Sequence, residues 1–161
     1  MPCHLHLVAL AGFAVLMAAA AFEDMRRLVI PNAVVLGLCV LWVFQLAATP
    51  AVSFAGSAGA VLCAGAVLVS GALLFSRGLM GGGDVKLLTA ATLWAGPTST
   101  PMLLLATAVL GGVLTLALLA PTALRAVLTP AVAAASKEVP VPYGVAIAGA
   151  SLIVMIPPNL N

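Results

Sequence analysis

The chain has 161 residues, of which 64% are hydrophobic and only 6% are charged. Soluble globular domains carry roughly 25% charged residues, so this composition excludes a water-soluble globule and is typical of a membrane protein. The formal net charge of +2 is too small and too scattered for a nucleic-acid surface. The length leaves no room for an added soluble module, so we expect a single transmembrane domain over residues 1–161.

Six apolar stretches predict an all-α, polytopic membrane protein with about six transmembrane helices. A span needs about 20 apolar residues, or somewhat fewer where neighbouring helices shield it. The fourth stretch is short, and no Lys or Arg precedes the first, which favours a retained helix over a signal peptide. In chain order the stretches are Leu5–Phe22, Ile30–Ala48, Ala55–Phe75, Val85–Ala95, Met102–Leu124 and Tyr143–Ile156.

The basic residues all fall in or beside alternate links between these stretches. The other two links, Thr49–Ser53 and Gly96–Pro101, contain no Lys or Arg. By the positive-inside rule the basic links face the cytoplasm, and both termini face outward. Asp24 and Asp84 are therefore expected at the same cytoplasmic membrane boundary. The basic residues are Arg26, Arg27, Arg77, Lys86, Arg125 and Lys137.

Asp84 follows a run of glycines, Gly81, Gly82 and Gly83, at the start of the fourth stretch. One interpretation is structural: the aspartate caps a helix that starts at Val85, behind a flexible glycine turn. The other is functional, because residues without side chains let a substrate backbone come close to the carboxylate. The two interpretations are compatible, since a capped carboxylate is also a positioned one.

Asp24 ends the first stretch, beside Glu23. A carboxylate at the C-terminal end of a helix opposes the helix dipole, and ionisable groups at membrane depth are costly and mark functional sites. The alternative is an interfacial charge that Arg26 or Arg27 neutralises, and the local sequence leaves Glu23 as another candidate for the active group. If Asp24 and Asp84 meet, they can share one proton, so that one activates water while the other polarises a scissile carbonyl.

No other catalytic set competes with the two aspartates. The sequence contains no Gly-x-Ser-x-Gly, no His-Glu-x-x-His, no Cys-x-x-Cys and no nucleotide-binding loop. We therefore expect no metal and no cofactor, with the two histidines in a solvated tail. The cysteines and histidines lack the spacing and the number of neighbouring ligands that a metal site needs. They are Cys3, Cys39, Cys63, His4 and His6.

Three segments together resemble the type IV prepilin peptidases. The run Gly81–Leu88 resembles the Gly-x-Gly-Asp motif of that family, Asp24–Asn32 resembles the region of its first aspartate, and Pro142–Ala146 resembles a Pro-Tyr-Gly segment near its C-terminus. Their order and spacing agree over nearly the whole chain. The resemblance implies an aspartic endopeptidase that removes the basic leader from prepilin-like proteins at the cytoplasmic face of the inner membrane. It makes Asp24 and Asp84 the catalytic pair.

The same resemblance assigns the remaining site residues and the partners. Gly81, Gly82, Gly83 and Lys86 form the active-site loop, and Glu23 is a candidate contact for the basic leader, equally able to neutralise an arginine. The partners are a prepilin-like substrate and the lipid bilayer. Larger family members carry a cytoplasmic insertion with paired cysteines, which is absent here. The chain is closer to the compact peptidases of tight-adherence (Flp-type) pili or of archaeal preflagellins, and with no methyl-donor site N-methylation is not expected.

Other classes explain these residues less well. Presenilin-like proteases share Gly-x-Gly-Asp, but their first aspartate follows a tyrosine, whereas Asp24 follows Glu23. A small transporter or channel subunit could use the acids to bind a cation or relay protons, yet such acids usually lie near the bilayer midplane. A structural subunit of a secretion system would leave the glycine run and the pair of carboxylates without a purpose.

Overall fold

The computed structural model describes residues 2–48, 54–128 and 141–155, with the side chains of residues 5–47, 55–119 and 141–155. Within these ranges the chain forms helices joined by short loops, and no strand. The all-α prediction is therefore confirmed. The helices are α1 (Pro2–Arg27), α2 (Asn32–Ala48), α3 (Phe54–Ser76), α4 (Gly82–Leu128) and α6 (Tyr143–Met155).

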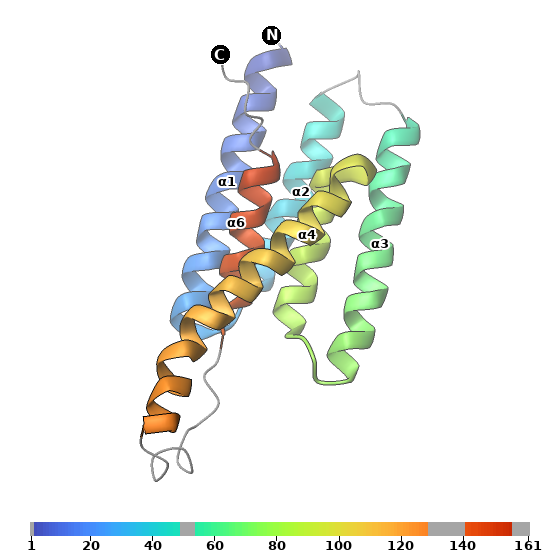
Figure 1. Cartoon of the computed structure of the whole chain (residues 1–161). Helices are drawn as coiled ribbons and strands as arrows, with labels where there is room; N and C mark the ends of the chain where they lie inside the picture. Colours follow the sequence, from blue (N-terminus) through green and yellow to red (C-terminus); the bar gives the residue numbers. More distant parts are fainter. Residues whose placement is uncertain (1, 49–53, 129–140, 156–161) are drawn as a thin grey trace.

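A sharp turn at Gly96 interrupts α4. This glycine has φ 66° and ψ 179°, values outside the helical region that glycine adopts without steric cost. Its carbonyl accepts a hydrogen bond from Oγ1 of Thr100, one turn into the next helical stretch, at 2.6 Å. The first half of α4 (82–95) and the second half (97–128) run in opposite directions (Figure 1). They contain the predicted fourth and fifth stretches, so the fourth is short because the chain reverses at Gly96.

Three helical segments are long and apolar enough to cross a membrane. They are Leu5–Arg27, Ala55–Ser76 and Gly82–Leu119, the last of which includes the turn at Gly96. α2 and α6 are apolar but shorter. These helices support a membrane protein, and the number of six spans stays a prediction. The first helix continues past the predicted end at Phe22, which places Asp24 inside α1.

Several helix ends meet at one end of the bundle. The C-terminal ends of α1 and α3 and the N-terminal ends of α2, α4 and α6 lie at the lower end in Figure 1. Arg26, Arg27, Arg77 and Lys86 therefore share this end, in agreement with the alternate-link pattern of basic residues. The remaining two basic side chains, those of residues 125 and 137, lie outside the described part.

The core packs α1, α2, the first half of α4 and α6 against one another. Phe13 of α1, Leu38 of α2, Leu87 of α4 and Ile147 of α6 are all buried. The rings of Phe13 and Trp94 lie 4.7 Å apart, and the indole N–H of Trp94 donates to the carbonyl of Leu38 at 2.9 Å. In a bilayer, such close packing and buried hydrogen bonds hold helices together. The core therefore fixes the helices whose ends carry the site.

Candidate active site

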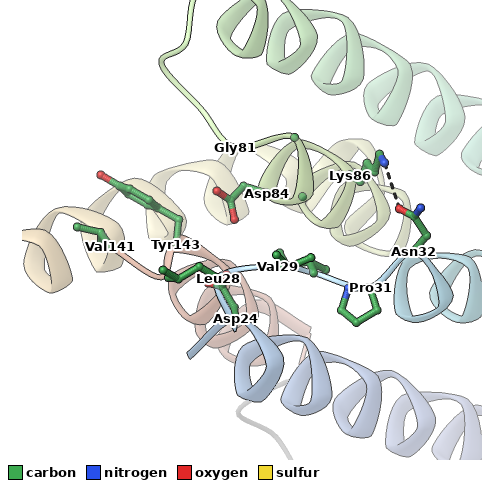
Figure 2. Close-up of a pocket in the computed structure, with 13 residues that line it drawn as sticks. Asp24, Leu28, Val29, Pro31, Asn32, Gly81, Asp84, Lys86, Val141 and Tyr143 are labelled. Carbon is green, nitrogen blue, oxygen red and sulfur yellow. Dashed lines mark hydrogen bonds between the residues drawn. The ribbon is translucent and has the colours of Figure 1, made fainter. Parts of the chain in front are cut away.

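An open cavity of about 670 Å³ lies at the end of the bundle where these helix termini meet. Its wall combines the C-terminal end of α1, the link from α1 to α2, the start of α4 and the start of α6. Asp24 and Asp84 both line it, and Figure 2 shows them on facing sides of the cavity. The tertiary fold thus brings together the two aspartates that the sequence singled out.

Asp24 is held by the first turn of α6. Its Oδ2 accepts a hydrogen bond from the backbone N–H of Gly144 at 2.7 Å. The N–H of Val145 adds a second bond, shared with the carbonyl of Pro142. The first N–H groups of a helix lack partners within the helix and carry partial positive charge. The unfavourable dipole at the end of α1 is therefore offset by the favourable start of α6.

The neighbouring acids of α1 have different environments. Asp24 is only 4% exposed, whereas Oε2 of Glu23 pairs with Nε of Arg27 at 3.5 Å on the outside of the helix. Arg26 lies over the ring of Phe22, 5.1 Å from its centroid. The idea that an arginine neutralises Asp24 is therefore wrong, and it applies to Glu23 instead. Glu23 does not line the cavity, so a contact with a substrate leader stays a prediction.

Asp84 occupies the first turn of α4 rather than its cap. The helix begins at Gly82, not at Val85, because the N–H of Val85 donates to the carbonyl of Gly81 at 3.1 Å. Gly81 is thus the capping residue. The carboxylate of Asp84 turns back and accepts a hydrogen bond from the N–H of Gly81, as the acidic residue of a capping box does. The sequence-based helix start was wrong, but the carboxylate is held by the backbone all the same.

The two carboxylates interact although they come from different helices. They lie close enough for the charge of Asp24 to act on Asp84. Each is anchored by backbone N–H groups at the start of a helix, Asp24 by α6 and Asp84 by α4. Two carboxylates that share a site resist double ionisation, so such a pair can hold one proton between them. This arrangement can supply both a base and an acid to one bound water and one carbonyl.

Two glycines permit these close anchoring contacts. A Cβ at Gly144 would lie 2.7 Å from Oδ2 of Asp24, and a Cβ at Gly81 would lie 2.8 Å from Oδ2 of Asp84. Real Cβ atoms essentially never come so near, so any larger residue would move the carboxylate. The close approach at Gly144 and Gly81 therefore serves the carboxylates, and access of a substrate backbone along the run Gly81–Gly83 stays a prediction.

The rest of the predicted active-site loop ties α4 to its neighbours. A Cβ at Gly83 would lie 3.3 Å from the Cβ of Ile30, and a Cβ at Gly82 would lie 3.3 Å from an aromatic ring of α3. The ammonium of Lys86 donates to Oδ1 of Asn32 at 3.1 Å, as Figure 2 shows. These contacts set the start of α4 against the link between α1 and α2, and they place a positive charge on the cavity wall.

Sequence reasoning missed three contributors to the site. Leu28 ends α1 with φ 53°, a left-handed conformation that is rare for non-glycine residues, and its N–H donates to the carbonyl of Asp24 at 2.9 Å. The hydroxyl of Tyr143 lies 3.1 Å from Oγ1 of Thr115. Gly144 supplies the bond to Asp24. The Pro-Tyr-Gly resemblance was the signal for Tyr143 and Gly144, whereas Leu28 lies within the Asp24–Asn32 segment without any role assigned to it there.

The His and Cys side chains that the structure describes do not line the cavity. His6 lies in α1 rather than in a tail, and its Nδ1 is 3.3 Å from Nε2 of Gln45. The tail expectation was wrong because the helix already begins at Pro2, a residue suited to a first turn. Cys39 and Cys63 are half-buried free thiols. Among the described residues no group of three or more His, Cys, Asp or Glu could hold a metal ion. The side chains of residues 3 and 4 lie outside the described part.

Most residues of this site lie in a region that matches a known protein family. The model described as the type IV leader peptidase family matches residues 11–116. The matched region includes Asp24, Asp84 and the glycine run, and it ends before the start of α6. No curated protein and no solved structure matches the chain.

Proposed function

Because the chain belongs to the type IV leader peptidase family, we propose that it is a membrane aspartic endopeptidase in which Asp24 and Asp84 activate water. One observation carries the proposal: carboxylates from two helices face one cavity, and each is anchored by the N–H groups of a helix start. Family membership supports peptidase activity, and the cavity identifies acids that can perform it. The residues that line the cavity lie at helix ends at one end of the bundle, a position that favours access from the aqueous phase over a transport path.

The proposed reaction uses the pair as both base and acid. The ionised carboxylate takes a proton from water as the water oxygen attacks the peptide carbonyl carbon. The protonated carboxylate gives its proton to the carbonyl oxygen, which forms a tetrahedral intermediate. The carboxyl that received the water proton then gives it to the leaving amine as the C–N bond breaks, and the other carboxylate takes a proton from a hydroxyl of the intermediate, so that the pair again holds one proton. Because the two titrations are coupled, the roles belong to the pair rather than to a named aspartate.

The proposed substrate is a prepilin-like protein with a basic leader and an apolar helix. The basic residues near the cavity support a cytoplasmic position for this end of the bundle, by the positive-inside rule. Cleavage would then occur at the cytoplasmic face of the inner membrane. The compact chain, without the insertion of larger family members, supports a precursor of the Flp type.

Co-expression with a prepilin-like substrate tests the proposal. Asp24→Asn and Asp84→Asn keep the size of each side chain but remove the ability to exchange a proton. Each is expected to lower the rate of leader removal at least about 10²-fold, because general acid–base catalysis contributes that much or more. Ser76→Ala, at the same end of the bundle and outside the cavity lining, serves as the control.

Leader removal is followed by gel shift and by intact mass, which also reports N-methylation. Thermal unfolding in detergent shows that each variant is folded. Wild-type processing rates in either aspartate variant would contradict the dyad.

A further inference from the structure

A second hollow lies beside the catalytic cavity. It has a volume of about 500 Å³ and is lined by the end of α3, the link to α4 and both halves of α4. Gly81 and Tyr143 line both hollows, so the second hollow adjoins the cavity that contains Asp84. We call it the apolar groove. The lining residues used below are Leu74, Leu79, Leu104, Thr107 and Ala108.

The two hollows differ in chemistry. The catalytic cavity presents two carboxylates, an amide and an ammonium group. The apolar groove has no charged lining residue in the described part of the chain, and its wall is mostly aliphatic. Leu79 is 71% exposed, and Leu74 and Leu104 are also exposed, so the groove is open at the side of the bundle. An apolar chain can therefore enter it laterally from a bilayer.

Thr107 brings an unsatisfied polar group to this wall. Its Oγ1 is buried and has no hydrogen-bond partner among the described residues. Four other threonines donate to a carbonyl one turn earlier, as helical threonines commonly do. They are Thr89, Thr92, Thr100 and Thr115. An unpaired buried hydroxyl is costly. Because Thr107 lines the groove, a peptide group bound there can serve as the partner of its hydroxyl.

We propose that the apolar groove binds the apolar segment of the substrate that directly follows the scissile bond. The proposal rests on the proposed peptidase function. A peptide bond held between Asp24 and Asp84 has two exits from the cavity. One path passes Gly81 and Tyr143 into the groove, and the other runs along the polar lining of the cavity. The apolar segment takes the path into the groove because removing apolar surface from water is favourable, and the basic leader stays in the polar part because losing its hydration would be costly.

Filling the groove tests this assignment. Ala108 and Ala117 are both exposed on the second half of α4, and of the two only Ala108 lines the apolar groove. In membrane vesicles containing the full chain and a prepilin-like substrate, Ala108→Phe is expected to raise KM about 10-fold with a smaller change in kcat. Ala117→Phe should stay within about 2-fold of wild type, as surface substitutions usually do. A leader peptide that ends in a short polar tail should be cleaved equally by both variants.

These outcomes separate the groove from the peptidase proposal. If Ala108→Phe processes the full substrate as wild type does, the groove assignment is overturned while peptidase activity stands. If wild type cleaves neither substrate, the peptidase proposal is overturned, and the groove assignment that rests on it is overturned with it. Equal losses on the full substrate and on the short-tailed peptide would also overturn the groove, because they indicate general damage to the site.

A photo-reactive residue at position 108 identifies the occupant directly. In an Asp84→Asn background the substrate is not consumed, so a crosslink should map to its apolar segment. Crosslinks only to lipid, to a second copy of the chain or to the leader would overturn the proposal. Thr107→Val is the companion variant, expected to slow processing about 3- to 10-fold without lower thermal stability. An unchanged rate would show that the hydroxyl does not contact substrate.

Discussion

The backbone N–H of Gly144 donates a hydrogen bond to Oδ2 of Asp24 across 2.7 Å, although 120 positions separate the two residues in the chain. This contact sets an acid at the end of one helix on the positive start of another. It also explains why the residue is glycine, because a Cβ there would lie 2.7 Å from the same oxygen. The geometry of the proposed dyad therefore depends on α6, which lies beyond the residues matched by the family.

Gly144→Ala is expected to displace the carboxylate of Asp24 and to slow leader removal roughly 10²-fold, the usual cost of a misplacement of about 1 Å. Gly149→Ala, on the same helix, is the matched control, because its Cβ would meet Leu110 at an ordinary 3.6 Å. Processing assays on both variants in vesicles make the comparison. Equal rates for the two would show that the Gly144 contact does not position Asp24.

Gly81→Ala and Gly112→Ala should have opposite effects. A Cβ at Gly81 would lie 2.8 Å from Oδ2 of Asp84, so this variant should lose processing about 10-fold or more through the displaced carboxylate. A Cβ at Gly112 meets nothing within 4 Å, and alanine is the better helix former by about 1 kcal/mol. Gly112→Ala should therefore keep its activity and unfold at a higher temperature in detergent. A loss of activity in both variants, or in neither, would contradict this account.

Leu28→Gly is expected to stabilise the fold by about 1 kcal/mol, because glycine adopts a positive φ without the clash that a Cβ causes. Leu28→Ala removes the same side chain but keeps the Cβ, so it should give no such gain. Thermal unfolding of the two variants in one detergent isolates the backbone effect. If alanine stabilises as much as glycine, the left-handed conformation is not strained in the protein.

The rate of leader removal should rise and then fall with pH, because the proposed pair works only when it holds one proton. The two apparent pKa values of this profile describe the pair and not the separate residues. Initial rates in vesicles, measured with one substrate over a series of buffers, provide the profile. A rate that does not change with pH would count against the shared proton.

Glu23→Gln tests the predicted contact with the leader. Removing the negative charge of this half-buried side chain is expected to raise KM for a substrate with a basic leader about 2- to 5-fold, an effect that salt should weaken. KM for a substrate with a neutral leader should not change. If both substrates respond alike, Glu23 does not contact the basic leader, and the ion pair with Arg27 stays as its observed interaction.

Much of this protein follows from local sequence. The shortage of charged residues in long apolar stretches requires helices in a bilayer, because only helices satisfy their own backbone groups there. The alternate placement of basic residues predicted that Asp24 and Asp84 lie at one end. The three motif segments indicated the family, which the match to residues 11–116 shows. Each of these signals resides in composition or in short segments, so no contact between distant residues was needed.

The local residues left Glu23 and Asp24 as equal candidates and the family resemblance favoured Asp24, but only the tertiary structure supplies the physical reason. Glu23 and Asp24 are adjacent and chemically alike, but helix rotation directs Glu23 toward Arg27 and Asp24 toward the N–H of Gly144. The start of α4 at Gly82 likewise goes with the hydrogen bond that the carboxylate of Asp84 accepts from the N–H of Gly81. A helix start and a buried carboxylate are stabilised by whichever partner the fold brings near. Those partners come from other helices, so the local sequence could not name them.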